Sequence, residues 1–195
     1  MARNNLYIFA VTGLFIIAGT LWAWGQPLIC TCGEIKFWVP TIFDGGNSQH
    51  IADWYTLSHI LHGVLIAFLG RILFPRSGFN MLFLTAIFTG IGWEVVEHTN
   101  WVLDAFRATT INVGYHGDSV LNAVMDYVFM MGGFFAAYNL RISVVIIGVL
   151  ALELVAGVFG RDNLTLSTIQ LIAPIEAIND WQQELNPVPF NGITN

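Results

Sequence analysis

Residues 79–98, FNMLFLTAIFTGIGWEVVEH, form the stretch that decides the fold of this chain. The segment carries no charge before Glu94, and about 20 apolar residues in a helix span the hydrocarbon core of a bilayer. It ends on two carboxylates and an imidazole, Glu94, Glu97 and His98, which share roughly one helical turn. The stretch therefore predicts a transmembrane helix with a polar end, and that polar end needs an explanation.

The rest of the chain shares this apolar character. Of its 195 residues 55% are hydrophobic and 10% are charged, and the mean hydropathy is +0.65, which excludes an ordinary soluble domain. An open sheet edge cannot be satisfied in lipid, and the alternating pattern of a barrel is absent. We predict an all-α integral membrane protein, a bundle of about five transmembrane helices plus a C-terminal interfacial helix, in a single domain 1–195. The expected spans are 6–24, 54–74, 79–98, 119–138 and 142–160.

Three segments lie outside these spans. Residues 25–53 are too apolar for a free linker, so we expect an outer loop that lies on the membrane surface or caps the bundle. Residues 99–118 are interpreted as a second outer loop. The C-terminal segment 164–183 is broken by Pro174 and is interpreted as an interfacial helix, with a sixth span as the alternative. The first span resembles a signal peptide, but its apolar run is long for one, so we expect it to be retained.

The charges suggest an orientation. With the N-terminus inside, four basic residues fall on the inner side and three on the outer side, a weak positive-inside signal. All 13 acidic residues and all five histidines then lie in the spans or the outer segments. The chain has a net charge of −6, its acidic residues are confined to that face and the spans, and nothing indicates nucleic-acid binding. The expected partner is the lipid bilayer, with other membrane-protein subunits as a further class of partner.

Polar residues recur at helical spacing in the outer parts of four expected spans. His59 and His62 lie three residues apart in the second span, and Glu94 and His98 lie four apart in the third, so each pair shares a helix face. Ionisable groups inside a membrane are costly unless they face one another, water or a metal. The economical arrangement is one shared cavity that opens outward. The other spans would contribute Asp118, Asn122, Asp126 and Glu153.

Histidines and carboxylates on facing helices are ligands suited to a divalent metal such as Zn, Fe or Mn. The candidate metal ligands are His59, His62, Glu94, His98 and Asp126. Such a metal activates water, and without a metal the same groups form an acid–base set. The candidate catalytic residues are Glu94, Glu97, Asp118 and Asp126.

Each candidate has a structural alternative. A single buried His is typical of helix packing, and Asp118 is expected to cap the fourth span, as Asp53 caps the second. The tryptophans near the outer ends, Trp93 among them, are interpreted as interfacial anchors without chemistry. Cys30 and Cys32 are too few to form a structural metal site, which needs four ligands. They are read either as two loop thiols or as a strained redox pair, because a C-x-C spacing is too short for an unstrained disulfide.

Four motifs in order, NSQHIADWYTLSHILHG, WEVVEH, GYHGDSVLNAVMDY and GRDNLTLSTIQLIAPIEAI, resemble a family of uncharacterised bacterial inner-membrane proteins, the domain-of-unknown-function family 2585. This resemblance implies a multi-pass protein of the bacterial plasma membrane and no established activity. A looser likeness is to VanZ-like membrane proteins, which also carry a His, a Glu and an Asp/Asn stripe on separate helices.

These observations leave three hypotheses for function. The first is an outward-facing intramembrane enzyme, metal-dependent or acid–base, acting on a lipid or another envelope substrate. The second is a non-catalytic accessory or assembly subunit of a larger membrane complex, with a structural polar cluster. The third is a transporter, which the absence of ionisable residues in the inner halves of the spans and of an internal repeat disfavours.

Overall fold

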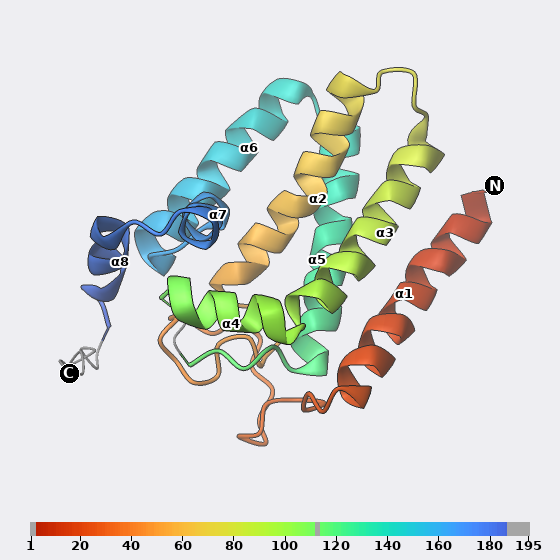
Figure 1. Cartoon of the computed structure of the whole chain (residues 1–195). Helices are drawn as coiled ribbons and strands as arrows, with labels where there is room; N and C mark the ends of the chain where they lie inside the picture. The colour runs from red at the N-terminus through yellow and green to blue at the C-terminus, as the bar shows by residue number, and fades with distance from the viewer. Residues whose placement is uncertain (1–2, 112–113, 187–195) are drawn as a thin grey trace.

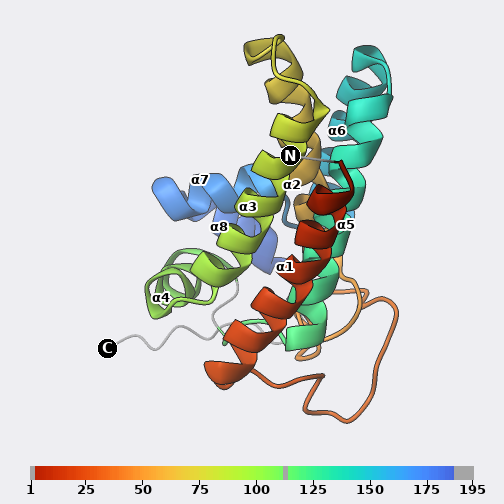
Figure 2. The ribbon, with the colours of Figure 1, turned by 90° about the vertical axis from the view of Figure 1, so that its right-hand side faces the viewer.

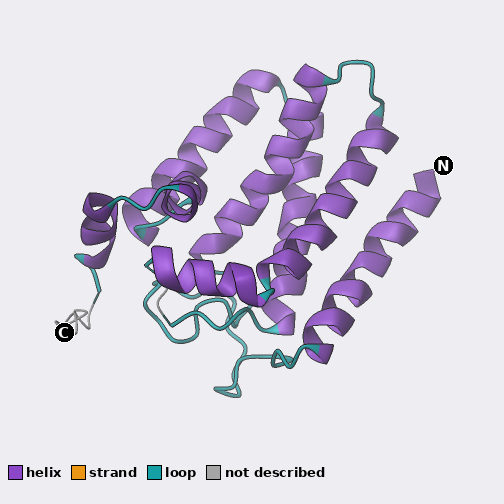
Figure 3. Ribbon diagram, viewed as in Figure 1, coloured by secondary structure: helices purple, strands orange, loops and turns teal. Residues whose placement is uncertain are grey.

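The computed structural model describes residues 3–111 and 114–186, and within them it contains helices and loops but no strand. Five helical segments are long and apolar enough to cross a membrane, which confirms the predicted all-α membrane fold. Figures 1 and 3 show them side by side in one bundle. They are α1 (Arg3–Ala23), α2 (Trp54–Leu73), α3 (Phe79–Glu97), α5 (Val120–Asn139) and Ile142–Gly160, which joins α6 (Ile142–Val155) to a π-helical turn (Ala156–Gly160).

The centre of the bundle is the pair α2 and α5, which pack more extensively than any other two elements described. Glycine makes this close approach possible at Gly63 and Gly133. A Cβ at Gly63 would overlap the backbone carbonyl of Met130, and one at Gly133 would overlap the carbonyl of Ile60. Small residues at such points let helix backbones approach closely in a membrane. The two glycines therefore bring the polar residues of α2 and α5 within reach of each other.

The loop 25–53 caps the end of the bundle and is hydrogen bonded to the start of α5. The amide of Val120 donates to the carbonyl of Pro27 at 2.8 Å, and the amide of Ser119 donates to the carbonyl of Ser48 at 3.0 Å. These bonds satisfy amides that the first turn of a helix leaves without an intrahelical partner. Of the two placements that the sequence suggested for this loop, the structure has the cap.

The segment 99–118 is not simply a loop, and this corrects the sequence-based interpretation. It contains a further helix, α4 (Asn100–Thr109), which buries Val102, Leu103 and Phe106 against the bundle. Their spacing of one, three and four residues is that of an amphipathic helix face. Figure 1 shows α4 lying across the bundle end instead of along it.

The C-terminal segment 164–183 also differs from the single helix expected there. It forms two short helices, α7 (Leu164–Ile172) and α8 (Glu176–Gln183), separated at Pro174. Proline lacks an amide hydrogen and disfavours helix in the residue before it, which explains the break. Figure 2 shows α7 on the same side of the bundle as α4, and the two helices are in contact.

Candidate functional site

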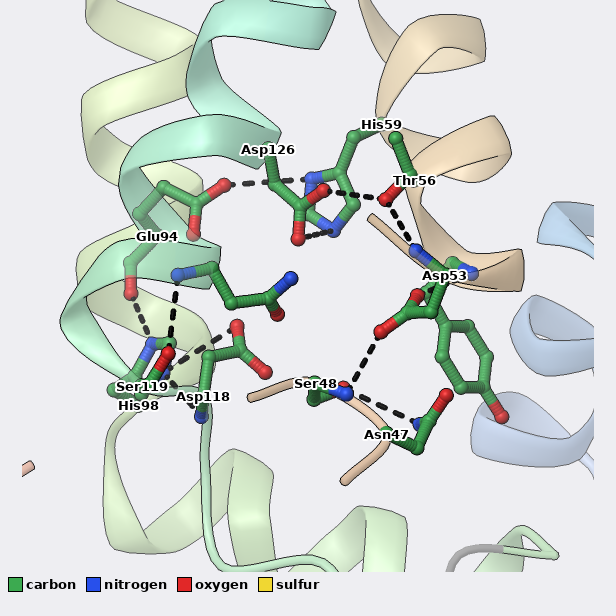
Figure 4. Close-up of polar contacts among 12 residues, drawn as sticks. Asn47, Ser48, Asp53, Thr56, His59, Glu94, His98, Asp118, Ser119 and Asp126 are labelled. Carbon is green, nitrogen blue, oxygen red and sulfur yellow. Dashed lines mark hydrogen bonds and ion pairs between the residues drawn. The ribbon is translucent and has the colours of Figure 1, made fainter. Parts of the chain in front are cut away.

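A buried histidine lies at the junction of α2, α3 and α5 (Figure 4). Nδ1 of His59 lies 3.3 Å from Oε1 of Glu94 on α3, and its Nε2 lies 3.8 Å from Oδ2 of Asp126 on α5. Glu94 has no exposed surface, and the other two side chains are nearly as deeply buried. The structure thus brings together three of the candidate residues, each from a different helix.

Glu97 joins this group from the next turn of α3. One ligand atom from each of His59, Glu94 and Glu97 lies within 4.8 Å of the other two. Both carboxylate oxygens of Glu94 and Oε2 of Glu97 are buried and accept no hydrogen bond; the contact between His59 and Glu94, although short, is too poorly aligned to count as one. Buried polar atoms in proteins almost always have partners, so orphaned carboxylate oxygens indicate a missing cation or proton.

A chain of hydrogen bonds holds Asp126 in place. Asp53 caps α2, as the sequence predicted, with Oδ1 accepting from the amide of Tyr55 at 2.8 Å. Its own amide donates to Oγ1 of Thr56 at 3.1 Å, and that hydroxyl donates to Oδ1 of Asp126 at 3.0 Å. Burial raises the pKa of the Asp53 carboxyl, although two backbone amides oppose the effect. The cap of α2 is therefore continuous with the polar centre.

His98 and Asp118 form a separate pair at the end of α3. Nε2 of His98 accepts from the backbone amide of Asp118 at 2.9 Å, and Nδ1 lies 2.7 Å from the carbonyl oxygen of Glu94. An amide only donates and a carbonyl only accepts, so the ring is neutral with its proton on Nδ1. Although Glu94, His98 and Asp118 also lie within 4.8 Å of one another, His98 has no free lone pair for a metal in this arrangement.

Asp118 is not the cap of α5, which corrects the sequence-based expectation. The cap is Ser119, whose side chain accepts from the amide of Asn122 at 3.1 Å. Asp118 instead accepts a hydrogen bond from the hydroxyl of Tyr115 at 2.8 Å. Burial, and after it the charge of Asp118, raise the pKa of Tyr115 well above its usual value, so the phenol keeps its proton.

A cavity of about 280 Å³ opens beside the polar centre, and His59, Glu97, Asp118 and Asp126 line it. Glu94 is not among the lining residues and lies behind His59. The wall that α4 and α7 contribute is mainly apolar, with Ser167 and Thr168 as its polar members. That wall includes Phe106, Leu164, Leu171 and Ile172.

Two aromatic side chains belong to this site that sequence reasoning did not assign to it. Trp93 lines the cavity and stacks edge-on against His62 with ring centroids 5.2 Å apart, so it is more than an interfacial anchor. Its position one residue before Glu94 was the available signal. Tyr115 was missed because it lies in a loop without helical periodicity. His62, a metal ligand expected from the sequence, lines the cavity but belongs to none of the described groups of atoms close enough to share a metal.

Glu153 does not reach the shared cavity, contrary to expectation. Its carboxylate accepts from the amides of Leu164 and Thr165, at 3.2 and 3.1 Å. It thereby holds the first turn of α7, where negative charge is favoured by the exposed amides and the helix dipole. The cap residue of α7 is Asn163, one of the two residues that the sequence suggested for this role.

Fold and site together define an all-α membrane protein with a histidine–carboxylate cluster buried between its helices. The model of a family described as "Protein of unknown function (DUF2585)" matches residues 21–184, and the chain belongs to this family. A UPF0314 protein of Rhizobium etli (strain CIAT 652) is 41% identical over 182 residues, covering 92% of this chain and 93% of the relative. UPF0314 proteins of Agrobacterium fabrum (strain C58) and Sphingopyxis alaskensis (strain RB2256) are each 39% identical; the matches cover 94% and 90% of this chain and 93% and 94% of those relatives.

These relatives are bacterial, so the findings support a membrane protein in bacteria. They confirm the resemblance to the uncharacterised family and do not show the looser likeness to VanZ-like proteins. No solved structure matches the chain.

Proposed function

We propose that this protein is an intramembrane enzyme of the bacterial inner membrane that uses a divalent metal to hydrolyse, or to transfer a group from, a lipid-like substrate. His59, Glu94 and Glu97 would hold the metal, and the cavity beside them would open toward the outer face. The N-terminus would then lie inside. One observation carries the proposal. The three ligand atoms lie within 4.8 Å of one another, and three oxygens of the two carboxylates are buried without a hydrogen-bond partner.

The residues around the cluster support a metal centre. Nδ1 of His59 faces the carboxylates while Nε2 faces Asp126, so Asp126 would orient the ring and fix the tautomer, as carboxylates commonly do for histidine ligands. Asp126 thereby becomes a positioning residue in place of the ligand that the sequence suggested. Imidazole with two carboxylates is a donor set suited to Zn, Fe or Mn, and such a metal lowers the pKa of a bound water.

Asp118 and Tyr115 would act on the substrate side of the cavity. The phenol donates to the Asp118 carboxylate, and both side chains line the cavity together with Glu97. Because Tyr115 keeps its proton, its hydroxyl would donate to a substrate oxygen or a leaving group by turning away from Asp118, its acceptor in this structure. Asp118 holds that hydroxyl in place.

The two walls of the cavity support an amphipathic substrate. The polar wall carries the histidine and carboxylates, and the apolar wall ends at Ile172, whose side chain is 79% exposed. A molecule with a polar head and an acyl or prenyl chain would match both walls. The apolar wall belongs to helices at the bundle end, where a lipid would enter from the outer leaflet.

Metal content tests the proposal directly. Protein purified in detergent is analysed by mass spectrometry for Zn, Fe and Mn, beside the single variants His59→Ala and His62→Ala. The two rings lie only 5.6 Å apart, so His62→Ala is a matched control for any loss of packing. We expect near-stoichiometric metal in the parent protein and in His62→Ala, and a loss of most of it in His59→Ala and in Glu94→Gln.

Two results would contradict the metalloenzyme. One is a well-folded parent protein without metal, and the other is an unchanged metal content in His59→Ala. Either result would favour the accessory subunit, for which Glu94→Gln is tolerated and stable partners co-purify. A pull-down from solubilised membranes would then be the next experiment.

A further inference from the structure

A second candidate reactive group, a disulfide, lies in the loop 25–53, away from the cluster of His59, Glu94 and Glu97. Cys30 and Cys32 are joined by a disulfide. The two sulfurs have different surroundings, because Cys30 is 5% exposed while Cys32 lies on the surface. An incoming thiolate can therefore reach Cys32 and not Cys30. This asymmetry defines an attacked sulfur and a leaving sulfur.

The leaving sulfur is supported by a hydrogen-bond donor and an imidazole. The backbone amide of Cys32 donates to Sγ of Cys30 at 3.2 Å. A ring nitrogen of His50 lies within 4.8 Å of both sulfurs, and His50 itself is only 1% exposed. Groups of this kind stabilise a thiolate, and a stabilised reduced form makes a disulfide more oxidising.

The tautomer of His50 follows from its contacts. Its Nδ1 accepts from the backbone amide of Lys36 at 3.2 Å, so the neutral ring carries its proton on Nε2. That nitrogen is buried without an acceptor. Burial, and then the charge of Lys36, lower the pKa of His50 and keep the ring neutral. The ring beside the disulfide therefore holds one unused proton, on Nε2, and that nitrogen offers no lone pair to a metal.

A cleft reaches the residue that lies between the two cysteines. A cavity of about 670 Å³ is lined by Thr31, the residue between the two cysteines, together with polar side chains that include Gln26, Asp44 and Gln49. Apolar side chains stand exposed beside the cysteines, with Ile29 38% and Ile35 56% exposed. A surface with a polar cleft and apolar neighbours suits an extended polypeptide segment better than a small thiol.

We propose that the Cys30–Cys32 disulfide is a redox-active centre that oxidises a dithiol in an extended polypeptide. One substrate thiolate attacks Sγ of Cys32, the bond between the cysteines breaks, and its electron pair remains on Cys30 as a thiolate beside His50. The second substrate thiol, losing its proton, then attacks the substrate sulfur of the mixed disulfide and releases Cys32. Two electrons pass from the substrate to the cysteine pair, and the two substrate protons pass to the two cysteine sulfurs or to water. The substrate leaves with a disulfide.

A single-turnover experiment tests this reaction without any further oxidant. The full-length oxidised protein in detergent micelles is mixed, without oxygen, with an equimolar fluorescent peptide that carries two thiols. We expect peptide oxidation together with the appearance of two alkylatable cysteines in the chain, and neither change with the double variant Cys30→Ser/Cys32→Ser. Peptide oxidation no faster than with that double variant would overturn the proposal.

Two further measurements separate the roles of the residues. With glutathione in place of the peptide, mass spectrometry is expected to find the adduct on Cys32 and the free thiol on Cys30, and an adduct on Cys30 would contradict the assigned polarity. In His50→Asn the amide oxygen keeps an acceptor for Lys36 while the Nε2 proton is lost. We expect this folded variant to react on the order of tenfold more slowly and to need a higher pH for alkylation of Cys30. An unchanged rate and an unchanged alkylation profile would remove His50 from the mechanism.

Discussion

At the scale of single residues, two buried carboxylates differ in how many hydrogen bonds their oxygens accept. Asp162 accepts from the hydroxyls of Tyr55 and Ser167, at 3.0 and 2.8 Å, from the amide of Asn163 at 2.9 Å and from Nε2 of Gln182 at 3.0 Å. Glu94 is buried as deeply and has two oxygens without such a bond. A fully satisfied carboxylate is typical of a structural hub, whereas an orphaned one lacks a cation or a proton, and this lack is the basis of the binding role proposed for Glu94. Residue type alone does not give this difference.

The hub at Asp162 predicts a pH effect on stability. Burial raises the pKa of Asp162 from 3.8 to about 6, against the effect of its hydrogen-bond donors. The folded state therefore holds the proton more tightly than the unfolded state does. The tighter binding of this proton stabilises the folded state by on the order of 3 kcal/mol. The effect is complete below pH 3.8 and is lost as the pH rises through about 6.

Asp162→Asn is the matched variant, because an amide oxygen can keep the two nitrogen donors while the two hydroxyls turn to accept. We expect the variant to fold and to lose this part of the pH dependence. Thermal unfolding in detergent over that pH range measures the difference between the two proteins. Parallel stability curves for parent and variant would show that Asp162 does not titrate in this way.

At the scale of elements, the packing of α2 on α5 controls the geometry of the site. Gly133→Ala places a methyl group against the backbone carbonyl of Ile60, so the helices must separate. We expect a loss of about 1 to 3 kcal/mol in stability and a lower affinity of the proposed metal site for zinc, iron or manganese. Gly132→Ala is the neighbouring control, because a Cβ there meets nothing within 4 Å. Thermal unfolding of both variants tests this, and equal stability would contradict it.

The apolar wall of the cavity depends on how α7 is held. Glu153 accepts from the first amides of α7, and Glu153→Gln removes the charge from that helix end. We expect a loss of about 1 kcal/mol at this helix end and faster hydrogen exchange in residues 164–167. Glu176→Gln, at the exposed start of α8, serves as the control. Exchange rates that match the parent protein would mean that Glu153 does not anchor α7.

At the scale of the whole molecule, five described helices are long and apolar enough to span a membrane, and an odd number of spans would put the start of the first and the end of the fifth on opposite sides. The loop 25–53 and the polar site lie at one end of the bundle, and the turn after α2 lies at the other (Figure 1). The basic residues and the disulfide suggest that the loop faces outward. Orientation is therefore a testable property of the whole chain.

Single cysteines test the orientation in a Cys30→Ser/Cys32→Ser background. We expect a membrane-impermeant maleimide to label Glu34→Cys in intact spheroplasts, and to label Ser77→Cys only after the membrane is permeabilised. Labelling of Ser77→Cys first would invert the proposed orientation. It would also move the candidate site to the cytoplasmic face.

The fold class, the long apolar helices and the caps at Asp53 and Asn163 could be predicted from the amino-acid sequence. Apolar runs, the cap at Asp53 and the pairing of His59 with His62 on one face are local properties, and each acts within a single element. Only the tertiary structure decided which faces meet. In the folded chain the ring of His98 is hydrogen bonded to the backbone, and Glu153 accepts hydrogen bonds from the first turn of α7. Trp93 and Tyr115 line the cavity. The physical reason is that a side chain's partner on another helix depends on how closely the two helices pack and on how each is rotated about its axis. The close approach at Gly63 and Gly133 is a property of the pair α2 and α5, and neither segment determines it alone.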